Sequence, residues 1–167
     1  AAVIRKWGAA LRWIQFTTSG TDKAFANGLP SGLVITNVAG LRAFSVAEQA
    51  FALMLGLVRR IRESEAARPR ESWIRDDLIP KADNLSGKRL LIVGLGAIGQ
   101  EVARKAKAFD MQVTGISRAR RSFPNVDLVR PRSEIVLACG EADIVLMAAL
   151  YGADTDKLLD RAAISAM

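Results

Sequence analysis

An apolar segment followed at once by a glycine-rich turn is the feature of this chain that most narrows its fold. Residues 89–93, RLLIV, have the length and composition of a buried strand, and GLGAIG occupies 94–99 directly after them. From 97 to 109, apolar residues recur with the spacing of one helix face. The order strand, glycine turn, helix is what a dinucleotide-binding fingerprint requires, so this GxGxxG is more specific than the bare motif.

Each part of the turn has a physical task in that interpretation. Gly94 permits the tight turn, Gly96 lets the backbone approach a pyrophosphate, and Gly99 lets the helix pack closely on the sheet. The free amides at the start of the helix, together with the helix dipole, favour phosphate groups. We predict cofactor binding by Gly94, Gly96, Ala97, Ile98 and Gly99; the alternative is a structural turn without a ligand.

The end of the next predicted strand, 113–116, indicates which dinucleotide is bound. NAD-binding domains usually place a carboxylate there to accept hydrogen bonds from the ribose 2′-OH. Here Ser117 and Arg118 follow the strand, the basic cluster continues to Arg121, and no carboxylate is present. Hydroxyl and guanidinium groups bind and neutralise a 2′-phosphate. We predict NADP(H) as the preferred cofactor, with NAD(H) or a merely solvated basic loop as the alternatives.

The remainder of the second half alternates between strand and helix patterns. Residues 126–129 and the apolar run 143–150 read as strands, and 132–139 and 155–167 read as helices. Alternation of this kind indicates a parallel sheet with right-handed crossovers. We therefore predict an α/β fold with a Rossmann-like, doubly wound parallel sheet.

The first half is expected to hold part of a second α/β domain. Residues 11–17 and 32–37 read as short strands, and a capping-box pattern at 45–48 predicts the start of a helix. Residues 49–58 carry no charge, so that helix must be covered on more than one side, either inside one domain or by a second domain or subunit. The polar segment with two prolines that follows is expected to cross between domains, giving the boundaries 1–63, 64–84 and 85–167.

Composition excludes several classes of function. The chain has no histidine and one cysteine, which rules out a catalytic histidine, a histidine-ligated metal or an internal disulfide within it, so no metal site is predicted. A net charge of +7 is spread along the chain without a nucleic-acid-binding signature, so nucleic acid is not an expected partner. No apolar run is long enough to span a membrane and no signal peptide is evident, so we expect a cytoplasmic protein.

Four stretches resemble the D-isomer-specific 2-hydroxyacid dehydrogenase family. LRWIQFTTSGTD resembles the strand and loop before that family's substrate site, and TNVAGLRAFSVAEQAFALMLGLVRRI resembles its TN…VAE segment and long apolar helix. LSGKRLLIVGLGAIG resembles the cofactor loop and the lead-in to it. ADIVLMAAL, with ADTDKLLDRAAISAM after it, resembles the strand and helix that follow. Together they run through nearly the whole chain.

The resemblance implies an oxidoreductase of the glyoxylate/hydroxypyruvate reductase type, with a flavodoxin-like substrate domain beside the cofactor domain. Such an enzyme reduces small 2-keto acids to D-2-hydroxy acids with NAD(P)H at a site between the domains. It implies that Thr18, Ser19 and Gly20 bind substrate, although an ordinary strand-end turn is the alternative. It also implies a homodimer joined through the apolar helix at 46–62.

Two departures from the family pattern limit these expectations. The sequence at 150–152, Leu-Tyr-Gly, stands where the family has a Pro-Leu-Thr-like sequence, and the family's catalytic Arg, Glu and His fall after Met167. We therefore expect no catalytic residue here and infer a fragment, inactive alone, of an NAD(P)-dependent parent enzyme. A dinucleotide-sensing, co-repressor-like protein without catalysis is the alternative that uses the same fold.

Overall fold

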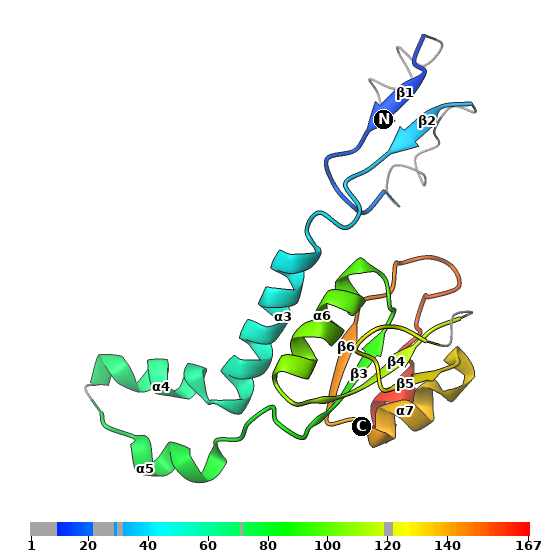
Figure 1. The fold of residues 1–167 in the computed structure, drawn as a ribbon. Coiled ribbons are helices and arrows are strands. Elements are labelled where there is room, and N and C mark those ends of the chain that lie inside the picture. Colours follow the sequence, from blue (N-terminus) through cyan, green and yellow to red (C-terminus); the bar gives the residue numbers. More distant parts are fainter. Residues whose placement is uncertain (1–9, 22–28, 30–31, 71, 119–121) are drawn as a thin grey trace. The chain divides into compact units, whose positions relative to one another are not determined.

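The computed structural model comprises two compact units (Figure 1). Unit 1 comprises Ala1–Arg42 with Leu150–Leu158, and unit 2 comprises Ala43–Ala149 with Leu159–Met167. The residues that the structure describes are 10–21, 29, 32–70, 72–118 and 122–167.

Unit 1 contains a pair of parallel strands. Strand β1 (Trp13–Gln15) pairs with β2 (Val34–Thr36), and the Trp13 indole Nε1 donates to Thr36 Oγ1 at 2.8 Å. Both strands lie inside the predicted ranges and are shorter than predicted. The parallel pairing requires a crossover connection between them, as in an α/β domain.

Unit 2 is built on a four-stranded parallel sheet in the order β5-β4-β3-β6. This confirms the predicted α/β class and parallel sheet. Its strands are β3 (Arg89–Val93), β4 (Gln112–Ile116), β5 (Leu128–Arg130) and β6 (Ile144–Met147), and its later helices are α6 (Ala97–Ala108), η3 (Arg132–Glu134), α7 (Ile135–Glu141) and α8 (Arg161–Ala166).

The two faces of this sheet are lined by alternate strand residues, as a pleated sheet requires. Leu90, Ile92 and Val113 belong to the buried core that includes α6, whereas Leu91 lines the opposite face with Ala138 of α7. Helices therefore cover both faces. The strand order reverses at β3, because β4 lies on one side of it and β6 on the other. Ligands of open α/β sheets bind at the carboxyl end of such a reversal.

The long apolar helix differs from the prediction at both ends. Helix α3 (Ala43–Val58) begins before Ser45, so Ser45 lies inside the first turn and the predicted capping box does not start the helix. Arg60 adopts the left-handed conformation (φ 55°), which ends α3 and separates it from α4 (Ile61–Ala67). The predicted helix 46–62 is thus two helices.

Helix α3 buries one face and exposes another that is also apolar. Ala47, Phe51 and Met54 face α6, and the Phe51 ring stacks on Phe109 with centroids 5.0 Å apart. The exposed apolar side chains that share one face, called the α3 outer face below, are Val46, Leu53 and Leu57.

Short helices and turns replace two predicted segments. Residues 64–84, which are predicted to cross between domains, contain η1 (Arg68–Arg70), α5 (Arg75–Leu78) and η2 (Ile79–Lys81). The predicted helix 155–167 is helical only in α8, because the Asp160 side chain accepts from the Ala163 N–H and so starts the helix there. None of the helices described has the length and apolar character to cross a membrane.

Candidate cofactor-binding site

The glycine turn lies at the carboxyl end of β3, where the strand order reverses. The Gly94 N–H donates to the Ile116 carbonyl of β4 at 3.3 Å, and the Ala148 N–H donates to the Val93 carbonyl at 2.8 Å. The turn is therefore tied to both neighbouring strands. This is the position at which open α/β sheets bind ligands.

Two of the glycines are required by the packing of the backbone itself. Gly94 has φ 102°, and a Cβ there would lie 2.6 Å from the Ala149 nitrogen. A Cβ on Gly99 would lie 2.1 Å from the Gly94 carbonyl oxygen and 3.1 Å from Ile92 Cγ2. A side chain at Gly99 would push α6 away from β3 and the turn, as the sequence predicts, whereas one at Gly94 would collide with the backbone that follows β6.

Gly96 differs from the other two, because a Cβ there would meet nothing within 4 Å. It precedes α6, and its carbonyl accepts the first helical hydrogen bond, from the Gln100 N–H at 2.9 Å. The amides of Ala97, Ile98 and Gly99 therefore have no carbonyl acceptor within the helix. Open space beside free amides at a helix start fits the pyrophosphate of a dinucleotide.

The predicted 2′-phosphate residues follow the adjacent strand. Val93 pairs with Ile116, and the Ser117 N–H donates to the Arg130 carbonyl of β5 at 3.1 Å. Because Ser117 and Arg118 follow Ile116, both lie at the same edge of the sheet as the glycine turn, where Ser117 is half-buried and Arg118 is exposed. Arg121 lies outside the residues that the structure describes.

Two contributors to this turn were not predicted. The Leu95 side chain is buried over β4, where a Cβ on Gly115 would lie 2.5 Å from Leu95 Cδ1. The Gln100 side chain donates from Nε2 to the Leu95 carbonyl at 2.9 Å. A glycine inside an apolar strand signals close approach of another group, so Gly115 could have been found from sequence. Gln100 is the fourth residue of α6, and a polar residue at that point of a helix gives no comparable signal in the sequence.

The predicted substrate residues form a compact loop within unit 1. Thr18 Oγ1 donates to the Gly20 carbonyl at 2.9 Å, and Asn37 Nδ2 donates to the Ser19 carbonyl at 3.0 Å. The loop thus follows β1 and is held by the residue that follows β2. Asn37 supports the loop and was not predicted to do so.

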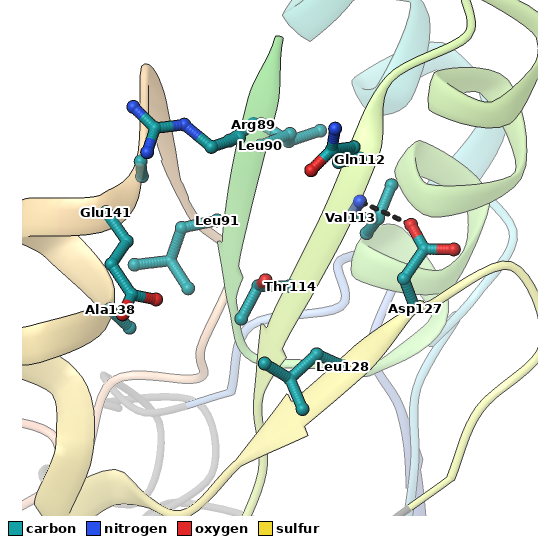
Figure 2. A pocket seen from close by; sticks show the side chains of 11 residues that line it. Arg89, Leu90, Leu91, Gln112, Val113, Thr114, Asp127, Leu128, Ala138 and Glu141 are labelled. Atoms are coloured by element: carbon teal, nitrogen blue, oxygen red, sulfur yellow. Dashed lines mark hydrogen bonds between the residues drawn. The ribbon is translucent and has the colours of Figure 1, made fainter. Parts of the chain in front are cut away.

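A hollow of about 640 Å³ lies toward the other end of the sheet in unit 2 (Figure 2). Arg89 and Gln112 mark the amino ends of β3 and β4, whereas the glycine turn follows the carboxyl end of β3. The hollow is therefore not the candidate cofactor site. It is lined by Arg89, Leu90, Leu91, Gln112, Val113, Thr114, Asp127, Leu128, Ala138, Glu141 and Ala142.

Carboxylates at that end of the sheet are held ionised by donors. The Arg89 side chain and backbone N–H lower the pKa of Asp143 to about 2. The Val113 N–H, at 2.7 Å, and Lys107 lower the pKa of Asp127. A carboxyl group with a lowered pKa holds no proton to donate at neutral pH, so these two residues suit structural pairing and not acid catalysis.

Three features define a dinucleotide-binding domain of the Rossmann type: the parallel sheet whose strand order reverses at β3, the glycine turn, and the free amides at the start of α6. Residues 51–167 match the family model of the D-isomer specific 2-hydroxyacid dehydrogenase NAD binding domain. The chain belongs to this family, as its motifs predicted.

Individual relatives agree with that assignment. Hydroxyphenylpyruvate reductase from Plectranthus scutellarioides is 33% identical over 136 residues, which cover 81% of this chain and 42% of the relative. Hydroxypyruvate reductase from Thermotoga maritima is 32% identical over 136 residues, covering 81% and 43%. The crystal structure of a glycerate dehydrogenase related protein from Thermoplasma acidophilum matches with a TM-score of 0.65 and 34% identity, covering 86% of this chain and 49% of that one.

The chain therefore spans less than half the length of each of these three proteins. These relatives are named as reductases or as related to a dehydrogenase. The comparisons do not favour the co-repressor-like alternative.

Proposed function

We propose that the full-length protein is a D-specific 2-hydroxyacid dehydrogenase that transfers a hydride between NADP(H) and a small 2-keto or 2-hydroxy acid. The observation that carries the proposal is the glycine turn at the sheet reversal, with free amides on α6 and with Ser117 and Arg118 after the neighbouring strand. Family membership supports the reaction class.

The proposed cofactor contacts divide into two groups. Gly94, Gly96 and the amides of Ala97, Ile98 and Gly99 form the pyrophosphate site. Open space at Gly96 and the close packing at Gly94 and Gly99 support that assignment.

NADP(H) is proposed over NAD(H) because of the residues after β4. Ser117, Arg118 and Arg121 are the proposed 2′-phosphate contacts. No carboxylate is present at 117–121 to accept from a ribose hydroxyl or to repel a phosphate.

The substrate end of the site is proposed in unit 1. The amides of Thr18, Ser19 and Gly20 would bind the carboxylate of the keto acid, supported by the loop that Asn37 holds. A bound nicotinamide dinucleotide supplies the hydride. The acid that protonates the substrate oxygen is expected outside this chain, which holds no histidine. In this proposal 1–63 belong to the substrate domain and 85–167 to the cofactor domain, with 64–84 crossing between them.

The α3 outer face supports a homodimer as the working assembly. Leu53 and Leu57 are 60% and 73% exposed on a helix whose opposite face is already buried. Exposed apolar area of this kind is typical of a subunit contact. The proposed contact uses α3 and the start of α4, within 46–62.

The test is steady-state reduction of glyoxylate and of hydroxypyruvate by the full-length protein, with NADPH and with NADH. We expect a higher kcat/KM with NADPH. Arg118→Asp should raise the KM for NADPH by roughly tenfold or more, the effect of losing a charge-assisted hydrogen bond, and should change the KM for NADH much less.

Arg75→Asp in α5, away from the turn, is the matched charge-reversal control and should leave both KM values unchanged. No turnover of either keto acid with either dinucleotide would contradict the proposed reaction. Equal effects of Arg118→Asp on NADPH and NADH would contradict the role of Ser117 and Arg118.

A further inference from the structure

We propose that Gln100 is a positioning residue for the dinucleotide, because it fixes the orientation of the Leu95–Gly96 peptide in the glycine turn. The inference rests on the proposed function, since it assigns the turn to a pyrophosphate. It concerns a residue outside the glycine motif.

Gln100 binds two consecutive carbonyl groups of the turn. Its side-chain Nε2 donates to the Leu95 carbonyl at 2.9 Å, and its backbone N–H donates to the Gly96 carbonyl at 2.9 Å. Both carbonyl dipoles are therefore directed to one residue of α6. A carbonyl oxygen facing an anion would repel it, so directing these two oxygens to Gln100 favours anion binding by the turn.

The side-chain hydrogen bond also sets the direction of an amide. In a trans peptide the C=O and the following N–H point in opposite directions. With the Leu95 carbonyl held by Gln100, the Gly96 N–H is turned away from that side chain. Rotation of the peptide would exchange this donor for an acceptor.

Leu95 is also held in place by its own side chain. It is 7% exposed, belongs to the buried core, and occupies the space above Gly115. Leu95 is thus fixed at its side chain by packing and at its carbonyl by Gln100. Of these two anchors, the hydrogen bond is the one that acts on the Leu95–Gly96 peptide itself.

The test variant is Gln100→Met in the full-length protein, which keeps the side-chain length and removes the donor. Binding of NADP and of adenosine 2′-monophosphate is measured by titration calorimetry; the second ligand has the 2′-phosphate and lacks the pyrophosphate. We expect NADP to bind roughly three- to tenfold more weakly, the effect of one hydrogen bond, with the affinity for adenosine 2′-monophosphate unchanged.

Gln112→Met is the matched control, because Gln112 lies at the amino end of β4 by the hollow and away from the turn. It should leave both affinities unchanged. If the full-length protein prefers NAD, the same comparison is made with NAD and adenosine.

Three outcomes would overturn the inference. Unchanged NADP affinity in Gln100→Met would show that the hydrogen bond does not position the turn. Equal weakening of both ligands with a lower thermal midpoint would show a role in folding only. Absence of dinucleotide binding by the unsubstituted protein would overturn the proposed function, and this inference with it.

Discussion

The three glycines of the glycine turn have different surroundings. Gly99 faces the Gly94 carbonyl, Gly94 adopts a conformation that disfavours side chains, and Gly96 faces open space. The motif predicted all three positions. It did not predict Gln100, because a hydrogen bond from a side chain to a loop carbonyl depends on where the folded loop places that carbonyl.

Alanine at Gly99 and at Gly96 should therefore have different effects. Gly99→Ala should lower the free energy of unfolding by about 1–3 kcal/mol, the usual cost of overpacking, because the new Cβ meets backbone atoms. Gly96→Ala should change it by no more than about 1 kcal/mol, typical of a helix-start substitution, while weakening dinucleotide binding. Denaturant titration and calorimetry measure the two quantities.

Gly56→Ala in α3 is the control for this pair, since a Cβ there also meets nothing within 4 Å. It should leave dinucleotide affinity unchanged. Strong destabilisation by Gly96→Ala, or unchanged binding, would contradict the assignment of Gly96 to the cofactor site.

At the level of helices and strands, the sequence predicted which elements exist better than where they end. Strand β3 was predicted with its observed bounds, because an apolar run between a charged residue and a glycine is unambiguous. The break after α3 was missed, since Arg60 has no residue-type signal for a left-handed conformation and is held by its Nε, which donates to the Lys81 carbonyl at 2.9 Å. That partner is distant in sequence, so local patterns do not show it.

The starts of β3 and β6 are joined by an ion pair that should make stability depend on pH. Arg89 Nη2 lies 2.8 Å from Asp143 Oδ1, and the Arg89 N–H donates to Oδ2 at 2.8 Å. The pKa of Asp143 is lowered to about 2 from 3.8. A carboxyl group whose pKa is lower in the folded state than in the unfolded state stabilises the fold at pH values above its unfolded-state pKa. This contribution should therefore be lost as the pH falls from about 4 toward 2.

Asp143→Asn should consequently make the thermal midpoint fall less steeply over that interval than in the unsubstituted protein. Asp77→Asn, in the exposed helix α5, controls for removal of one negative charge and should keep the steeper fall. Both side chains of the pair are partly exposed, so the difference should shrink at high salt. Parallel curves for Asp143→Asn and the unsubstituted protein would contradict a stabilising pair.

For the whole molecule, the alternation of strands and helices was enough to predict a parallel doubly wound sheet, because few topologies satisfy that order. The sequence also predicted that α3 needs cover on more than one side. The structure accounts for one side, through packing of Phe51 and Met54 toward α6. Which surface covers the outer face depends on an assembly, and residue patterns within one chain do not specify it.

Charge on the α3 outer face should therefore change the oligomeric state. Leu53→Lys together with Leu57→Lys should convert the proposed full-length dimer to monomers, since charges at the centre of an apolar contact are left unpaired. Light scattering coupled to size-exclusion chromatography measures the mass. Ile79→Lys, at an exposed apolar residue of η2, is the control and should leave the mass unchanged. A dimeric double variant would place the subunit contact elsewhere.

The fit of Leu95 over Gly115 also limits how this sequence can diverge. The two residues belong to different elements, yet any methyl group added at 115 takes space that the leucine already fills. A larger residue at 115 requires the Leu95 side chain either to shift or to be replaced by a smaller one, so the two positions constrain each other. Lineages that retain Leu95 should retain Gly115, and the two positions should change together when they change at all.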